Sequence, residues 1–314
     1  MGILGSNNQK IIEDTFGNPI ASKILKHKDI VALKKLFHDI PFIYSQRYFY
    51  SLAFSRRFPV KILEQWVKQE PENADAHLVY GARLLKLAWK ARGFGRGHDI
   101  SAQQWQEFYA LLDQTIEELE TAARLKDDDP TPWVYLIMAA VYHSQGAETE
   151  LRYYNEAGKR DPNNWHAHIH RLTGLSKKYG GSHQLMFDFV KNVQGQSADN
   201  NLLNCLVFKA HSEYWKYKSQ FEGDEKAAEN HANDPAVIAE CLAVYESTLA
   251  SNEYDSFDVL FARINATGLF HVLRQKEPLK TELKNLQGQL EDVHWTWVGT
   301  GWELRQAKLL SVLG

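Results

Sequence analysis

Residues 129–189 decide the fold, and they are DPTPWVYLIMAAVYHSQGAETELRYYNEAGKRDPNNWHAHIHRLTGLSKKYGGSHQLMFDF. Two Asp-Pro pairs begin at positions 129 and 161, 32 residues apart, and a tryptophan follows each proline by three positions. Between the pairs lie two segments with apolar residues at helical spacing, separated by Ser-Gln-Gly at 144–146. Proline suits the first turn of a helix and disrupts a helix interior. The stretch therefore predicts two consecutive helical hairpins.

A repeat of about 30 residues built from helix, turn and helix is typical of a solenoid of stacked helix pairs. The stretch resembles the tetratricopeptide-repeat family. The matching positions are Trp133, Leu136, Gly146, Tyr154, Ala157 and Pro162. Two positions depart from that pattern, since Ile137 stands where a small residue is expected and Glu150 stands where a small alanine normally packs. The resemblance implies helical hairpins over roughly residues 100–195.

A second resemblance involves shorter segments. Ala-Trp-Lys-Ala-Arg-Gly at 88–93, together with Trp165 and Lys-Tyr-Gly-Gly-Ser at 178–182, is similar to a family of uncharacterised bacterial repeat proteins. That resemblance implies no particular activity.

Apolar residues at helical spacing continue through most of the chain. They predict helices from 22 or 29 to 38, and at 59–70, 74–91, 101–126, 202–217, 236–250, 257–274 and 279–293. The aromatic-rich segment 41–54 has a composition that suits a strand, but we predict a buried helix because it lies between two clear helices. Residues 219–235 are charged and weakly apolar, which favours a mobile loop or a domain seam. Residues 294–314 are predicted to form a closing helix at the end of the array.

These segments predict an all-α protein of about twelve helices. We expect antiparallel helix hairpins stacked as a degenerate, tetratricopeptide-like α-solenoid. The predicted regions are an N-terminal helical region at 1–72, the repeat-like hairpins at 73–195, and a C-terminal helical region with a capping helix at 196–314.

Composition argues against several classes of protein. The formal net charge of −3 gives no general attraction to nucleic acid or to a membrane surface. The two cysteines, Cys205 and Cys241, form no C-x-x-C pair and favour a reducing compartment over a disulfide framework. No run approaches 18 apolar residues, and the N-terminus lacks a signal-peptide pattern. We therefore expect a cytoplasmic protein with no cofactor, no metal, and no nucleic-acid or membrane partner.

A glycine-rich segment, Arg-Gly-Phe-Gly-Arg-Gly-His at 92–98, suggests a loop whose backbone N–H groups and arginines bind phosphate. The segment lacks the G-x-x-x-x-G-K-[ST] pattern, and no predicted strand precedes it. A turn between two helices, with a packing or functional role, is the better interpretation.

Three histidines, His166, His168 and His170, with His183 downstream, suggest a metal site. On a helix His166 and His170 share one face, while His168 points elsewhere. A zinc enzyme would need a third ligand and usually a general base, as in H-E-x-x-H, and that pattern is absent. Polar surface residues or hydrogen-bonded repeat histidines are the preferred interpretation.

Charge is unevenly distributed along the chain. Residues 1–61 contain ten Lys or Arg against four Asp or Glu, and residues 101–150 contain two against ten. Solvated helix faces explain this pattern, and two surfaces of opposite sign that recruit a charged partner are the functional alternative.

We expect a non-catalytic module that binds a protein or peptide, acting as an adaptor, a regulator or an immunity-type inhibitor. The candidate partner-binding residues are Trp89, Arg92, Arg96, His98, Tyr142, Trp165, His166, His170 and His183. The alternative is a hydrolase-type enzyme with an acid/base pair in the groove, because carboxylates far apart in sequence can meet in space. Two converging carboxylates with raised pKa values would favour the enzyme, and an open aromatic groove would favour binding.

Overall fold

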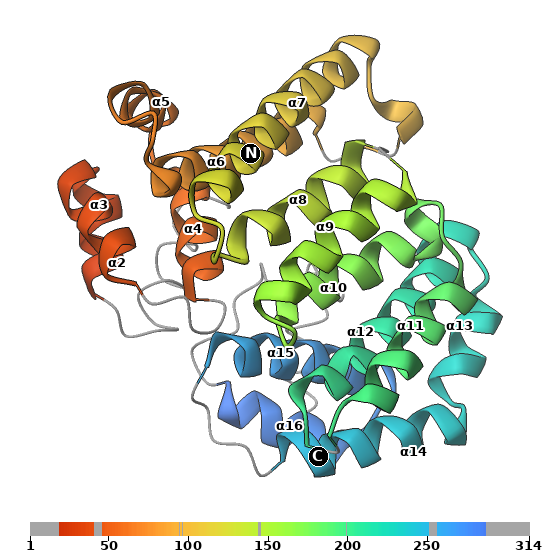
Figure 1. Cartoon of the computed structure of the whole chain (residues 1–314). Helices are drawn as coiled ribbons and strands as arrows, with labels where there is room; N and C mark the ends of the chain where they lie inside the picture. The colour runs from red at the N-terminus through yellow and green to blue at the C-terminus, as the bar shows by residue number, and fades with distance from the viewer. Residues whose placement is uncertain are drawn as a thin grey trace. The chain divides into compact units, whose positions relative to one another are not determined.

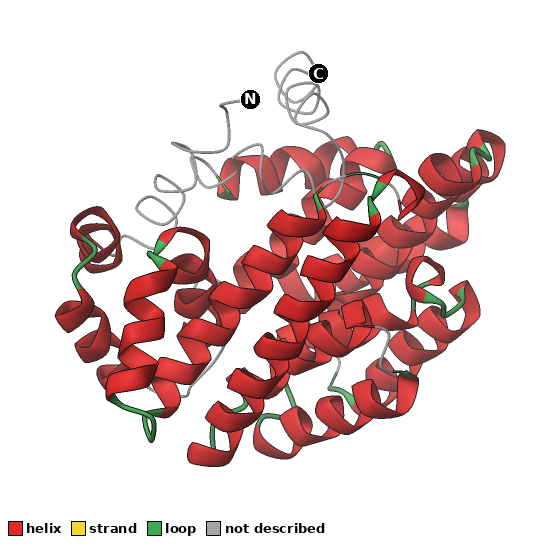
Figure 2. Ribbon diagram, turned by 90° about the horizontal axis from the view of Figure 1, so that it is seen from above, coloured by secondary structure: helices red, strands yellow, loops and turns green. Residues whose placement is uncertain are grey.

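The structure is a computed structural model that describes residues 19–40, 46–93, 95, 97–143, 146–198, 200–250 and 256–286. These residues form fifteen α-helices and contain no strand (Figure 2). The predicted all-α class is confirmed, while the expected number of about twelve helices is too low. The chain divides into two compact units, an N-terminal unit at Pro19–Gly174 and a C-terminal unit that begins at Leu175. The division into regions 1–72, 73–195 and 196–314 stays a prediction.

Nine helices of the N-terminal unit follow one another with short connections (Figure 1). They are α2 (Pro19–His27), α3 (Ile30–Asp39), α4 (Gln46–Arg57), α5 (Val60–Gln69), α6 (Ala74–Arg92), α7 (Ala102–Leu125), α8 (Thr131–His143), α9 (Ala147–Arg160) and α10 (Trp165–Leu175). Helices α6 and α7 pack together, as do α8 and α9. The first of the two hairpins predicted in 129–189 is therefore present as the packed pair α8–α9, and the helices predicted at 74–91 and 101–126 also pack as a pair. The helices of the second predicted hairpin belong to different units, because α10 ends the N-terminal unit and His183–Gln196 lies in the C-terminal unit.

The aromatic-rich segment is helical where the structure describes it. Helix α4 begins at Gln46, and its residues 47–55 are all buried; residues 41–45 lie outside the described part of the chain. A helix that is buried all round shows no polar stripe, so its apolar residues lack the period expected of a surface helix. This explains why the segment has the composition of a strand.

The starts of α6 and α7 are fixed by N-terminal capping residues that can be recognised in the sequence. Asn73 caps α6 by accepting from the backbone N–H groups of Asp75 and Ala76. Ser101 and Gln104 form the predicted capping box at the start of α7. A Cβ added to Gly81 would lie 2.8 Å from Leu119 Cγ, so the missing side chain lets the two helices approach closely.

The C-terminal unit is also helical throughout its described residues. Its α-helices are α11 (His183–Gln196), α12 (Leu206–Lys216), α13 (Glu225–Ala232), α14 (Pro235–Val244), α15 (Phe257–Val272) and α16 (Lys276–Asn285). Two π-helical segments, Tyr217–Glu222 and Tyr245–Leu249, extend α12 and α14. Helix α12 packs against α11, α13 and α15, and α15 packs against α16.

The loop or domain seam predicted at 219–235 is wrong. The segment completes a π-helical turn and then forms α13, and the division between the two units falls instead at 174–175. Ala228 and Ala232 are the buried residues of α13. Burial by alanines gives only a weak apolar signal in the sequence. The closing helix expected at 294–314 and the end of the helix expected at 279–293 lie outside the described residues.

No helix in the described part of the chain is both long enough and apolar enough to span a membrane.

Candidate binding site in the N-terminal unit

Side chains from three helices meet around Tyr48 of α4. The Tyr48 ring lies 4.2 Å from the His166 ring in a stacked arrangement and 4.7 Å from the Tyr135 ring, measured between centroids. Tyr48 Oη lies 3.0 Å from His170 Nε2, within hydrogen-bond distance. All four residues are buried. We call Tyr48, Tyr135, His166 and His170 the Tyr48 cluster.

A second aromatic contact joins α8 to α6. Trp89 of α6 and Tyr142 of α8 meet edge to face, with 4.6 Å between their ring centroids. Tyr142 lies seven residues after Tyr135, which places both on one face of α8. Trp89 and Tyr142 are half-buried, so this group stays partly open to solvent. The Tyr48 cluster is buried, and within this set only Trp89 and Tyr142 are partly open to solvent. The two groups come from α4, α6, α8 and α10, and we call them together the aromatic face.

Three basic side chains, Arg56, Arg83 and Lys86, lie on α4 and α6. Arg83 Nη1 donates to the Ser55 carbonyl at 2.8 Å and to the Arg56 carbonyl at 3.1 Å, which joins α6 to the C-terminal end of α4. Lys86 lies one turn beyond Arg83 on α6. Burial, with a smaller contribution from the charge of Arg56, lowers the pKa of Lys86 to about 8.

The surroundings of Arg56 connect it to the Tyr48 cluster. Burial is the main cause that lowers the pKa of Arg56, and the two tyrosines Tyr48 and Tyr135 act on it electrostatically. Burial raises the pKa of both tyrosine hydroxyls, and the Arg56 charge opposes that change. Among the described residues, no carboxylate forms an ion pair with Arg56 or Lys86 or shifts the pKa of either.

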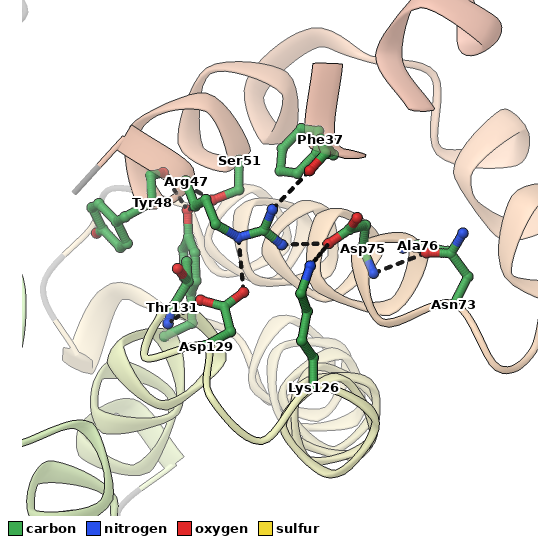
Figure 3. Close-up of polar contacts among 11 residues, drawn as sticks. Phe37, Arg47, Tyr48, Ser51, Asn73, Asp75, Ala76, Lys126, Asp129 and Thr131 are labelled. Carbon is green, nitrogen blue, oxygen red and sulfur yellow. Dashed lines mark hydrogen bonds and ion pairs between the residues drawn. The ribbon is translucent and has the colours of Figure 1, made fainter. Parts of the chain in front are cut away.

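Arg47, on the same helix as Arg56, has the opposite environment (Figure 3). Its Nε donates to Asp129 Oδ2 at 2.9 Å, its Nη1 donates to the Phe37 carbonyl at 2.9 Å, and its Nη2 donates to Asp75. Lys126 also approaches Asp75, at 3.6 Å. Arg47 and Asp129 are both buried. This arginine is fully engaged in holding α3, α4, α6 and the start of α8 together.

Asp129 gives the first Asp-Pro pair a role that the sequence pattern did not reveal. Its Oδ1 accepts from the Thr131 backbone N–H at 2.9 Å while its Oδ2 accepts from Arg47. Among the described residues, the Asp161 side chain of the second pair accepts hydrogen bonds only from nearby groups, the Asn163 backbone N–H and the Asn164 side chain. The first pair therefore links distant helices, and the second only shapes a turn.

The glycine-rich tip uses its first arginine internally. Arg92 Nη1 donates to the carbonyls of Gly93 and Gly95 at 3.2 and 3.1 Å. Its guanidinium also lies over the rings of Trp89 and Trp105, at 5.4 and 4.9 Å from their centroids. Arg92 thus stabilises the turn between α6 and α7.

Of the other two residues predicted at this tip, the structure describes His98 but not Arg96. His98 is exposed and lies 3.3 Å from Asp99. Arg96 lies outside the described residues. A role of Arg92, Arg96 and His98 in partner binding stays a prediction.

The histidines of α10 are buried, which excludes the first of the two preferred interpretations, polar surface residues. The second, hydrogen-bonded histidines, agrees with the contacts of His168 and His170. His166 and His170 share a face as predicted, with 6.2 Å between their ring centroids, and both contact Tyr48. His168 points elsewhere, against the Tyr154 ring, and its Nδ1 lies 2.9 Å from the Asn164 carbonyl oxygen. Trp165 is buried in the core.

Burial lowers the pKa of His166 to about 3, so the imidazole is neutral at physiological pH.

His183 belongs to the C-terminal unit, where it joins a separate group of histidines. Its ring lies 4.6 Å from the Tyr214 ring, which in turn lies 4.2 Å from the His231 ring. His211 bridges His231 and Glu240, with 3.0 Å from its Nδ1 to His231 Nε2 and 3.1 Å from its Nε2 to Glu240 Oε2. Within the described residues, no group of three or more His, Cys, Asp or Glu side chains is arranged to hold a metal ion.

Sequence reasoning missed Tyr48, Tyr135, Arg56 and Lys86. Their common signal is weak, because each is an ordinary residue of a predicted helix. The spacing of Tyr135 and Tyr142 on one face of α8 was available from the sequence, but nothing in it indicated that α4 lies beside that face. His231 was missed because 219–235 was interpreted as a loop. Without His231, nothing in the sequence indicated that His211 and Glu240 belong to one group.

The carboxylates give no support to an acid/base pair. Glu150 is the only carboxylate among the described residues whose pKa is raised, and burial is the cause. Its Oε1 lies 3.1 Å from Arg171 Nη1. A single carboxylate paired with an arginine is not the converging pair that glycoside-type hydrolysis needs.

Comparisons with protein-family models, with curated proteins and with solved structures find no match to this chain. The resemblance of residues 129–189 to tetratricopeptide repeats stays a prediction.

Proposed function

We propose that this chain is a non-catalytic binding protein, and that the aromatic face of the N-terminal unit takes a segment of a protein or peptide partner. The observation that carries the proposal is the edge-to-face pair of Trp89 on α6 and Tyr142 on α8, both half-buried and so partly open to solvent. Aromatic side chains with little conformational freedom are the residues that contribute most binding energy at protein interfaces. An adaptor, a regulator or an immunity-type inhibitor would each use such a face.

The fold in this proposal is an array of tetratricopeptide-like hairpins. Helices α6 with α7 and α8 with α9 supply two successive packed pairs, and α4, α6, α8 and α10 share the residues of the aromatic face. In stacked helix pairs the first helices of successive repeats form an extended binding surface. The aromatic face would be that surface.

A cytoplasmic location is part of the same proposal. Cys205 and Cys241 are both free and buried. Burial raises the pKa of both thiols, which keeps them protonated and unreactive. Free, buried thiols are typical of proteins in a reducing compartment such as the cytoplasm, where cysteines serve as small apolar side chains.

The proposal is tested by site-specific photo-crosslinking. A photo-reactive phenylalanine analogue replaces Tyr142, and in a matched protein it replaces Leu151, an exposed residue of α9, a helix that contributes no residue to the aromatic face. We expect a discrete adduct from native cytosol at position 142 and none at 151. The crosslinked protein is then purified and titrated calorimetrically against the unmodified chain, where we expect saturable binding. Equal labelling at both positions, or no binding by the purified protein, would refute the proposal.

The tip residues need a separate test, because Arg92 holds its own loop. Alanine at Arg96 and His98, with Arg92 retained, keeps the contacts that Arg92 makes with Gly93, Gly95 and Trp105. If the tip contributes to binding, this double variant lowers the affinity for the captured partner while the thermal unfolding curve stays unchanged. Unchanged affinity would remove the tip from the site.

A further inference from the structure

His77, near the start of α6, connects three parts of the N-terminal unit. Its Nδ1 lies 2.5 Å from Glu118 Oε2 on α7, and its Nε2 lies 2.9 Å from the carbonyl oxygen of Pro71, in the turn between α5 and α6. The His77 side chain is buried. The imidazole is therefore a buried link between α7 and the α5–α6 turn.

Both ring nitrogens of His77 face hydrogen-bond acceptors. A carbonyl oxygen can only accept a hydrogen bond, so Nε2 carries a hydrogen. An ionised carboxylate also only accepts, and a carboxyl group is more acidic than an imidazolium by about two pKa units, so Nδ1 carries the second hydrogen. The two contacts of His77 together therefore require the doubly protonated imidazolium.

The turn that His77 contacts is also connected to α3 and α5, through Glu70. Lys34 Nζ of α3 donates to Glu70 Oε1 at 2.5 Å, and Trp66 Nε1 of α5 donates to Glu70 Oε2 at 3.0 Å. Helix α5 packs against α6 and buries Leu63 and Trp66. The turn and α5 are therefore joined by Glu70, and His77 joins the turn to α7.

We propose that His77 is a proton-dependent latch, which holds the α5–α6 turn to α7 while its imidazole is doubly protonated and releases the turn when it loses a proton. A neutral imidazole has one N–H group, so it can donate to Glu118 or to the Pro71 carbonyl but not to both. The bond to the charged carboxylate is the stronger one, so the bond to the Pro71 carbonyl is lost. Helix α5 then keeps its apolar contacts with α6 and loosens at its C-terminal end. This device does not depend on the proposed binding function.

The groups that act on His77 decide the direction of its titration. Burial lowers the pKa of His77, but the hydrogen bonds to Glu118 and to the Pro71 carbonyl outweigh burial, so the pKa is raised. The charge of Arg124 on α7 acts in the opposite sense to that of Glu118. A histidine whose pKa is raised by folding stabilises the folded state below the unfolded value of about 6.5. That stabilisation is lost as the pH rises from 6.5 through the pKa of the folded state.

The other titratable groups on α5, the turn and α6 do not account for a change near neutral pH. Carboxyl groups ordinarily titrate near 4. Burial raises the pKa of Tyr80, one turn along α6 from His77, above the ordinary value of about 10. Glu72 of the turn is exposed. Three carboxylates on these elements are paired with cations, which are Glu64 with Lys68, Glu70 with Lys34, and Asp75 with Arg47 and Lys126.

Hydrogen exchange of the α5 amides in the full chain tests the latch. The exchange rate of each amide, divided into the rate of an unfolded peptide at the same pH, gives its protection factor. We expect the protection of α5 to fall as the pH rises above about 6.5, by up to about tenfold per pH unit, until the pH passes the pKa of His77 in the folded chain. The amides of α9 are the internal reference and should keep their protection. Constant protection of α5 between about pH 6 and pH 9, or an equal loss in α9, would contradict the latch.

Glu118→Gln changes the pH at which the latch opens. Glutamine keeps an acceptor for His77 Nδ1 but removes the negative charge, so the pKa of His77 falls and α5 should loosen at a pH lower by about one unit or more. His143→Gln is the matched control, because His143 of α8 makes the same kind of pair with another α7 carboxylate, Asp113, at 2.8 Å. It should keep the wild-type pH profile of α5. An unchanged profile in Glu118→Gln, or the same shift in His143→Gln, would overturn the inference.

The protonation of the His77 ring can also be measured by nuclear magnetic resonance. The chain is labelled with ¹⁵N-histidine, and the His77 signals are assigned by their loss in His77→Gln. Near pH 6 both ring nitrogens should have the chemical shifts of protonated nitrogen, and one should lose its proton over the pH range in which α5 loosens. A single protonated nitrogen near pH 6 would show that the latch is not charged. The exchange measurements on the wild type and on Glu118→Gln need no substitution at His77, so they decide the question even if His77→Gln does not fold.

Discussion

Glu150 of α9 and Arg171 of α10 form an ion pair within the N-terminal unit, with 3.1 Å between Oε1 and Nη1. Gly174 lies directly beside the Glu150 carboxylate, and a Cβ added at that position would overlap it. Glu150 stands where the tetratricopeptide pattern places a small alanine. The structure shows how the larger residue is accommodated: the missing side chain at Gly174 provides the space, and Arg171 provides the charge.

Gly174→Ala should therefore destabilise the N-terminal unit. Alanine normally stabilises a helix interior by about 1 kcal/mol relative to glycine. Here the added methyl group forces the buried carboxylate away from Arg171, and overpacking of this kind costs about 1–3 kcal/mol. Gly158→Ala in α9 is the matched control, because nothing lies within 4 Å of a Cβ added there, and it should be neutral or stabilising. Thermal unfolding followed by circular dichroism measures both.

Glu150→Ala should suppress the effect of Gly174→Ala. Alone, the substitution leaves Arg171 without its buried partner, which costs about 3–5 kcal/mol for a fully buried pair and less here because Arg171 is partly exposed. In the double variant the two small side chains fit side by side, so the combined loss should fall short of the sum by more than about 0.5 kcal/mol. Strictly additive losses would show that Gly174 does not make room for Glu150.

Arg47→Met should be among the most damaging substitutions in the chain. It removes the partner of Asp129, which is buried, and it also removes a hydrogen bond to the Phe37 carbonyl. Loss of one member of a buried ion pair costs about 3–5 kcal/mol. Lys35→Met, which removes only an exposed pair with Asp39, should change stability by less than about 0.5 kcal/mol. Hydrogen exchange of the α4 and α8 amides would show the difference locally, and equal protection in both variants would contradict it.

The helices of the N-terminal unit could largely be predicted because their signals are local. The capping box at Ser101 and Gln104 and the turn at Gly146 mark the ends of helices within a few residues. Helix α13 could not be predicted, because its buried residues are the alanines Ala228 and Ala232 and its remaining surface is charged.

The candidate site was predictable only in part. Spacing alone placed His166 and His170 on one face, and the structure confirms this. It could not show that Tyr48, 122 residues before His170, would meet them, because that contact depends on how α4 packs. Nor could the spacing distinguish Arg47 from Arg56. The packing of distant helices brings carboxylate partners to Arg47, and among the described residues none pairs with Arg56.

The histidine group of the C-terminal unit should make that unit sensitive to acid. Burial lowers the pKa of His231 to about 4, and the charge of His211 contributes to the change. An unfolded histidine titrates near 6.5. Between these two values the unfolded state binds more protons than the folded state, so stability falls as the pH drops from about 6.5 toward 4. The slope from this one group approaches about 1.4 kcal/mol per pH unit.

His231→Gln should reduce that slope without changing the fold, because glutamine keeps a polar group near His211. His98→Gln is the control, since His98 is exposed. Hydrogen exchange of the α12 and α13 amides, measured across this pH range, reports on the C-terminal unit without assuming that the whole chain unfolds in one step. If stability falls with pH as steeply in His231→Gln as in the wild type, groups other than His231 cause the acid sensitivity of the C-terminal unit.

Lys86 should react with acylating reagents faster than an ordinary lysine near pH 8. Its pKa of about 8 means that roughly half of its amine is neutral at that pH, whereas a lysine with a pKa of about 10.4 is almost entirely protonated. Arg56→Met removes the neighbouring positive charge, so the pKa of Lys86 should rise and its acylation should slow. The pKa should not return fully to the ordinary value, because burial, the larger cause, persists. Acetylation by a limiting amount of acetic anhydride, quantified by peptide mass spectrometry against Lys35 in the same sample, measures both changes. A higher pKa leaves less of the amine neutral, so the charge effect of Arg56 predicts slower acylation in Arg56→Met. Faster acylation in that variant would contradict this prediction. It would show that the arginine side chain blocks access of the reagent to Lys86.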